Sequence, residues 1–149
     1  MGALALILSC AAAAAQPANW RRYVVPESGA SVDIPLGIFT EEGGKPETGV
    51  GGRFLTSDHR ANLTVQSVSS EGLSPARFLA AKSPPSNIVY KRITDRLFVV
   101  SSVRNDRIWY NRCNFAGRTA NCVLINYPAA EKRQWDGIVT RISNTLASR

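Results

Sequence analysis

Ser57, Asp58 and His59 stand next to one another and are the residue types of a hydrolase catalytic triad. In such triads the nucleophile and its base converge from separate segments, and three neighbours in one turn cannot reach that geometry. The chain also lacks the G-x-S-x-G pattern that exposes a nucleophilic serine on a sharp turn. We therefore interpret His59 as an exposed turn residue and predict no catalytic residues, so that the protein is not an enzyme. A small hydrolase that uses His59 is the less favoured alternative.

Cys113 and Cys122 frame the segment CNFAGRTANC, which has the pattern of a β-hairpin. Glycine readily adopts positive φ, so Gly117-Arg118 suits the two-residue loop of a type II′ turn. Pairing outward from this loop places the two cysteines opposite each other at a non-hydrogen-bonded position, with Cα atoms about 4.5–5.5 Å apart. A disulfide fits that separation, and we predict a structural one. No metal and no cofactor are predicted, because the two thiolates lack further ligands and His59, the single histidine, is distant in sequence.

A second group of residues at the same hairpin could recognise an anion. Arg112, Asn114 and Asn121 interrupt the apolar pattern of one strand face, and Arg118 lies in the turn. An arginine beside two amides can bind a carboxylate or phosphate through paired hydrogen bonds. We therefore name Arg112, Asn114, Arg118 and Asn121 as candidate ligand-binding residues. The alternative is that the helix over this face ends before the hairpin tip and leaves these residues in water.

The chain has 149 residues, with 18 Lys and Arg against 11 Asp and Glu, and a formal net charge of +7. Nucleic-acid binding requires such basic residues to gather on one surface. Here they are spread along the predicted strands: at about 3.3 Å per residue, Arg107 and Arg118 lie roughly 35 Å apart. We therefore expect no nucleic-acid partner. No apolar run reaches the ~20 residues that a transmembrane helix needs, so none is expected in the mature chain.

The first fifteen residues, MGALALILSCAAAAA, are uncharged and apolar and end in small residues. This pattern is typical of a secretory signal peptide over residues 1–15, with cleavage leaving Gln16 as the mature N-terminus. The expected location is therefore periplasmic or secreted, an oxidising compartment that agrees with the predicted disulfide. Two alternatives remain: lipidation of Cys10 in ILSC, which would anchor the protein to a membrane, and an Ala-rich buried helix.

Residues 16–149 are predicted to form a single α+β domain. Ala61, Leu63 and Val65 alternate with polar residues, as in a strand that has one buried face. The strands are expected at Trp20–Val25, Ser31–Ile34, Arg53–Ser57, Arg60–Val68, Ile88–Thr94, Leu97–Arg104, Arg107–Phe115 and Ala120–Tyr127.

Two helices complete the predicted domain. Ser74 is a good N-cap and Pro75 suits the first position of a short helix, which Pro84-Pro85 ends. The last helix has a continuous apolar stripe at helical spacing, formed by Trp135, Ile138, Val139, Ile142 and Leu146. Both faces of the central strands are apolar, so both must be covered. We expect a mostly antiparallel sheet with a helix on each face, an α/β/α sandwich.

The order of these elements resembles a known family. Trp20 and Tyr23 open the domain, the strand Ser31–Pro35 reads SVDIP, the short helix Ser74–Leu79 reads SPARFL, and Ile142 lies near the end of the last helix. This layout is similar to the small exported Mog1/PsbP-like α/β/α sandwich domains and to secreted proteins of α-proteobacteria with the same order of elements. The resemblance covers most of residues 20–147 and implies a fold and a binding or assembly role, without shared catalytic residues.

The sequence thus favours an exported, non-enzymatic protein that binds a partner protein of the envelope or an anionic envelope ligand. The alternatives are a structural lipoprotein anchored to the membrane through Cys10 and the small hydrolase described above.

Overall fold

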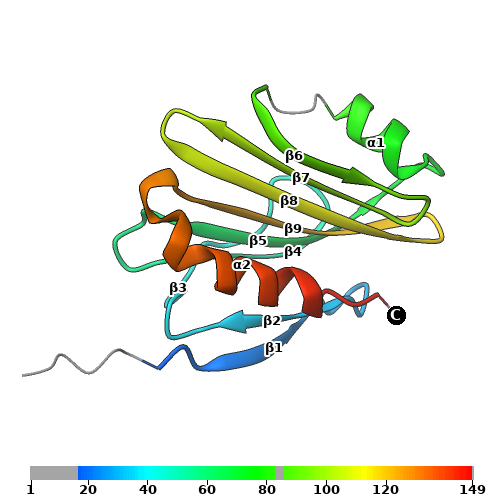
Figure 1. Ribbon diagram of the computed structural model, residues 1–149. Coiled ribbons are helices and arrows are strands. Elements are labelled where there is room, and N and C mark those ends of the chain that lie inside the picture. Colours follow the sequence, from blue (N-terminus) through cyan, green and yellow to red (C-terminus); the bar gives the residue numbers. More distant parts are fainter. Residues whose placement is uncertain (1–16, 83–85, 149) are drawn as a thin grey trace, which may run out of the picture.

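The computed structural model describes residues 17–82 and 86–148 (Figure 1). The leader predicted over residues 1–15, including Cys10, therefore lies outside the described residues. The strands of the described part are β1 Trp20–Val24, β2 Ser31–Pro35, β3 Glu41–Glu42, β4 Val50–Leu55, β5 Asn62–Ser69, β6 Ile88–Ile93, β7 Leu97–Arg104, β8 Arg107–Ala116 and β9 Thr119–Pro128. The helices are α1 Pro75–Ala81 and α2 Lys132–Thr145, the latter preceded by a 3₁₀ turn at Ala129–Glu131.

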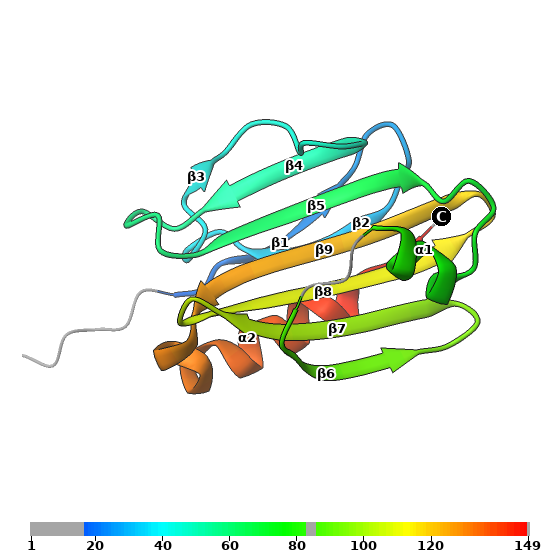
Figure 2. The same cartoon turned by 90° about the horizontal axis from the view of Figure 1, so that it is seen from above.

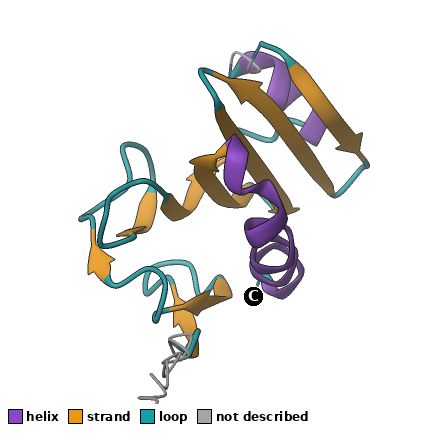
Figure 3. Ribbon diagram, turned by 60° about the vertical axis from the view of Figure 1, so that its left-hand side comes forward, coloured by secondary structure: helices purple, strands orange, loops and turns teal. Residues whose placement is uncertain are grey.

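Seven strands form one antiparallel sheet in the order β3-β4-β5-β9-β8-β7-β6, and β1 and β2 pair separately as a two-stranded ribbon. The two helices lie on opposite faces of the large sheet (Figure 1, Figure 3). The predicted α+β class, with a mostly antiparallel sheet and a helix on each face, is confirmed. The sequence did not predict that β1 and β2 would separate from the sheet and share a face with α2.

The face under α2 carries the larger hydrophobic core. The predicted stripe is confirmed: Trp135, Val139, Ile142 and Leu146 are buried, and Ile138 is half-buried at its edge. The stripe packs both on the sheet and on the ribbon, where the core contributions are Val32, Ile34, Leu63, Val65, Val123 and Ile125. One helix face therefore joins two sheets that share no strand pairing.

The ribbon is attached to α2 and to the sheet by specific contacts. The ring of Tyr23 meets that of Phe54 on β4 edge-on, with centroids 5.1 Å apart. The Arg141 guanidinium of α2 lies 4.1 Å from the centroid of the Trp20 ring. At the C-terminus of α2 the Thr145 hydroxyl accepts a hydrogen bond from the Asp33 backbone N–H, at 2.9 Å. These contacts hold the ribbon against α2 and β4.

The opposite face is covered by α1 at one end only (Figure 2). Ser74 caps this helix as predicted: its hydroxyl accepts a hydrogen bond from the Arg77 backbone N–H at 3.3 Å, and Pro75 is the first helical residue. Phe78 packs edge-on against Phe115, with centroids 5.4 Å apart. The seven residues of α1 thus cover the sheet near the turn between β8 and β9, and no other helix of residues 17–82 and 86–148 lies on this face.

The turn between β8 and β9 has the predicted form. Gly117 has a φ of 57°, Arg118 is not among the residues with positive φ, and Ala116 pairs with Thr119. Cys113 and Cys122 are therefore directly opposite and form a disulfide, with a Cα–Cα distance of 4.1 Å. The turn between β4 and β5 is wider than predicted. It spans Thr56 to Ala61, because the Thr56 backbone N–H and hydroxyl both bond to the Ala61 carbonyl, at 3.1 and 3.2 Å.

Removing the disulfide tests its contribution to this hairpin. We expect the double variant Cys113→Ala, Cys122→Ala to lose about 2–3 kcal/mol of unfolding free energy, because the unfolded chain regains the entropy of an open loop. Urea unfolding of the variant and of the oxidised and reduced wild type measures the change. Equal midpoints for the oxidised and reduced wild type would contradict the prediction.

The pKa of Tyr127 predicts how the free energy of unfolding depends on pH. Burial, with a smaller contribution from the Asp136 carboxylate, raises the pKa of Tyr127 to about 12. The unfolded phenol titrates near 10, so the folded state holds the proton more tightly. The stabilisation is complete below pH ~10 and is lost as the pH rises toward ~12. Urea midpoints measured across this range should fall less steeply for Tyr127→Phe than for the wild type, and equal slopes would contradict the assignment.

Candidate functional site

The uncovered part of the α1 face forms a groove whose floor is set by the strand register. Arg53, Thr64, Leu124, Asn111 and Val100 lie in one row across β4, β5, β9, β8 and β7. The next row, farther from α1, contains Asn62, Asn126, Trp109 and Ser102. Side chains from five strands therefore point to one surface, although their positions in the sequence span fifty residues or more.

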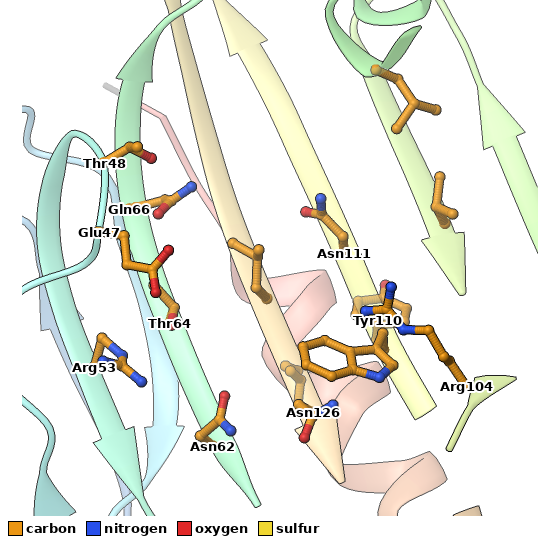
Figure 4. A pocket seen from close by; sticks show the side chains of 15 residues that line it. Glu47, Thr48, Arg53, Asn62, Thr64, Gln66, Arg104, Tyr110, Asn111 and Asn126 are labelled. Atoms are coloured by element: carbon orange, nitrogen blue, oxygen red, sulfur yellow. The ribbon is translucent and has the colours of Figure 1, made fainter. Parts of the chain in front are cut away.

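The groove has a volume of about 460 Å³, within the range of ligand-binding pockets. Figure 4 shows polar side chains on both of its walls and along its floor, whereas the labelled Tyr110 bonds to Ser143 on the α2 side of the sheet. Its lining consists of Glu47, Thr48, Arg53, Asn62, Thr64, Gln66, Leu79, Val100, Arg104, Trp109, Tyr110, Asn111, Leu124, Ile125 and Asn126.

The β5 wall offers polar groups that the protein itself does not use. Asn62, Thr64 and Gln66 are half-buried, whereas Leu63 and Val65 between them are buried in the opposite core. Within residues 17–82 and 86–148, the side chains of Asn62, Thr64 and Gln66 form no hydrogen bond with the protein. Two amides and one hydroxyl are therefore free to bind a ligand.

The far wall combines a cation with an aromatic ring. Trp109 is 40% exposed, and the Arg104 guanidinium lies 5.0 Å from its ring centroid. Arg53 stands on the opposite wall, beside Glu47 at the rim (Figure 4). With Arg53, Arg104 and Glu47 as its charged lining residues, the groove has a formal net charge of +1, which favours an anionic ligand.

A glycine shapes the β4 side of the groove. Gly51 pairs with Gln66 and has a φ of +141°. A Cβ at Gly51 would lie 1.9 Å from the Val65 carbonyl oxygen, so no other residue fits without moving the backbone. The row that contains Gln66, Cys122, Cys113 and Phe98 consequently carries no side chain on β4.

Three of the four predicted ligand-binding residues do come together, but under the C-terminal end of α2. The Arg112 guanidinium donates to the Asn114 side-chain oxygen at 3.0 Å and to the Ser143 hydroxyl at 3.2 Å. The Asn114 amide donates to the Leu146 carbonyl at 3.1 Å. These side chains bond to residues at the end of α2, and their role in binding an anion stays a prediction.

Asn121 is the most buried member of this group, at 4% exposure. Its side-chain oxygen accepts from the Ser67 hydroxyl at 2.6 Å, and its amide donates to the Ser148 hydroxyl at 2.8 Å. The alternative that this side chain lies in water is therefore wrong, because the chain continues over it beyond α2. Arg118 is separate from the other three: it is exposed in the turn, and its guanidinium lies beside Gly72.

His59 lies where the sequence predicts, exposed in the turn between β4 and β5 with a φ of 57°. Its Nε2 atom is 2.5 Å from the Glu41 carboxylate. Asp58 serves the same turn: hydrogen bonds from the Arg60 backbone N–H and then from the Thr56 hydroxyl lower the pKa of its carboxyl group. The partners of His59 and Asp58 therefore differ from those of a catalytic triad.

Two further observations concern metal ligands and membrane-spanning helices in residues 17–82 and 86–148. Among these residues, the His, Cys, Asp and Glu side chains form no group of three or more that could hold a metal ion. In the same residues, no helix combines the length and apolar character needed to cross a membrane.

The fold is similar to that of a known protein. The solution structure of cyanobacterial PsbP (CyanoP) from Synechocystis sp. PCC 6803 aligns with a TM-score of 0.60, over 95% of this chain and 98% of that chain. The two sequences are 12% identical. No protein-family model and no curated protein sequence matches the chain. The PsbP-like part of the predicted resemblance is thus confirmed for the fold, while the Mog1 and α-proteobacterial parts stay predictions.

Sequence reasoning missed the groove although its signal was present. The polar residues Asn62, Thr64 and Gln66 were recognised as the outer face of a strand, which is normally solvent-exposed. Asn111 and Asn126 stand in strands that are otherwise largely apolar. Only the register of β5, β9 and β8 shows that these amides share one surface.

The role of Arg112 can be separated from that of Arg118 by stability. We expect Arg112→Met to lower the unfolding free energy by about 1–2 kcal/mol, because Ser143 and Asn114 lose hydrogen bonds to a charged group. Arg118→Met, on the same hairpin but exposed, should leave it unchanged. Urea unfolding compares the two variants, and equal effects would contradict a structural role for Arg112.

Proposed function

We propose that the chain is an exported, non-enzymatic binding protein that holds an anionic ligand in the groove of the α1 face. The observation that supports this most is the combination of free amides on one wall with Arg104 and exposed Trp109 on the other. An aromatic ring with a few convergent polar groups is typical of ligand sites.

Export is supported by the disulfide between Cys113 and Cys122, because such bonds persist in oxidising compartments. The signal peptide over residues 1–15 and the single domain over residues 16–149 remain part of this proposal. So does the alternative anchor at Cys10, which a denatured mass would identify as a lipidated species that starts at that residue.

A partner protein of the envelope is the second candidate ligand. Four of the exposed large apolar side chains belong to β6, which is an edge strand: Ile88, Val89, Tyr90 and Ile93. The hydrolase alternative gains no support, because His59 contacts Glu41 in an exposed turn and is not among the residues that line the groove.

Charge-neutralising variants test the proposal in the protein purified from its host envelope. Native mass spectrometry should show an anionic small molecule on the wild type that disappears on denaturation. We expect the double variant Arg53→Gln, Arg104→Gln to lose this molecule, because both side chains line the groove.

Arg21→Gln, Arg133→Gln is the matched control, since it removes the same charge from exposed positions outside the groove. The control should retain the molecule. Equal loss of the molecule in both double variants would show that binding depends on net charge and not on the groove. A wild type that carries only a protein would contradict the anionic ligand and favour the partner protein.

A further inference from the structure

The groove continues beneath α1. A second hollow of about 390 Å³ adjoins the first and shares five lining residues with it: Thr48, Gln66, Leu79, Asn111 and Leu124. Because both hollows open over the same rows of the sheet, they form one groove that runs along β5, β9 and β8. From Gln66 to Asn62 alone this direction covers four residues of strand, or about 13 Å.

The two ends of this extended groove differ in chemistry. The end beside α1 combines the apolar side chains of Val68, Phe78 and Phe98 and the disulfide with the polar residues Thr48, Ser69 and Lys82. The other end carries Arg104 and Trp109, with the free amides between. Leu79 and Leu124, shared by both hollows, extend the apolar surface from one end toward the other.

We propose, on the basis of the function proposed above, that the groove binds an anionic amphiphile, a linear alkyl chain that ends in one carboxylate or phosphate group. The chain lies along Leu124 and Leu79 and enters beneath α1. The anionic group lies at the Arg104 end.

Charges along the groove agree with this orientation. Glu47 lies on the same side of the groove as Arg53 and its carboxylate opposes an anion there, so Arg104 on the far wall is the better counterion (Figure 4). Lys82 lines the α1 end, where its ammonium lies 5.3 Å from the centroid of the Phe78 ring. Between these cations the groove is lined by Leu79 and Leu124 together with the amides of Gln66 and Asn111.

A series of sodium hexanoate, octanoate and decanoate tests the proposal by calorimetric titration of the full chain. We expect the association constant to rise about three- to four-fold for each methylene that becomes buried. Glucuronate, which has the charge without the chain, should bind at least tenfold more weakly than decanoate. An association constant independent of chain length, with glucuronate binding equally, would overturn the amphiphile and leave the proposed anion site intact.

The position of the chain is tested by two further measurements. Leu124→Asn should flatten the dependence on chain length, whereas Leu36→Asn, an exposed leucine outside the groove, should not. In the wild type, a nitroxide at the chain end of decanoate should broaden the amide signals of Phe78 and Leu79 more strongly than that of Arg104. The reverse pattern would overturn the orientation even if the Leu124 variant failed to fold.

A last experiment distinguishes a free amphiphile from a membrane lipid as the molecule that supplies the anionic group. Decanoate should compete with phosphatidylglycerol vesicles if the groove extracts a lipid from the bilayer. Binding to vesicles that decanoate does not displace, together with no binding of the monomeric series, would place the interaction at the membrane surface and overturn the groove as the site.

Discussion

The register of β9 against β5 and β8 determines which side chains face α2 and which face the groove. β9 is the central strand of the seven, and its hairpin with β8 is closed by a glycine turn and by the disulfide between Cys113 and Cys122. Side chains alternate between faces along a strand, so a shift of one residue would move every side chain to the other face. The core under α2 and the rows of the groove both follow from this single alignment.

The parts of the fold that the sequence predicted are those with a local cause. The turn between β8 and β9 needs the positive φ that Gly117 accepts, Ser74 and Pro75 start a helix, and the stripe from Trp135 to Leu146 has helical spacing. The β1–β2 ribbon was not predicted as a separate sheet, because its position depends on Tyr23 meeting Phe54 and on Arg141 meeting Trp20. Such contacts join distant segments and leave no trace in local periodicity.

The roles of the polar residues at the candidate site also depend on contacts between distant segments, which the sequence does not show. Asn114 interrupts an apolar strand face and Gln66 lies on the polar face of an alternating strand, and neither pattern shows which amide the fold itself binds. Asn114 bonds to the Leu146 carbonyl because α2 ends above it. Gln66 keeps its amide free because α1 ends before it. Where each helix stops relative to the sheet therefore decides which polar residues support the fold and which are left for a ligand.

The unequal lengths of the helices make the groove a consequence of the fold. At about 1.5 Å per residue, the fourteen residues of α2 extend roughly 21 Å and the seven of α1 only about 10 Å, against about 33 Å for ten-residue strands such as β8. An antiparallel sheet tolerates one solvated face when its outward side chains are polar. Here Leu124 and Trp109 stand among the amides, and exposing them to water costs free energy that Asn or Thr would not. The ligand proposed above would cover these two side chains and remove that cost.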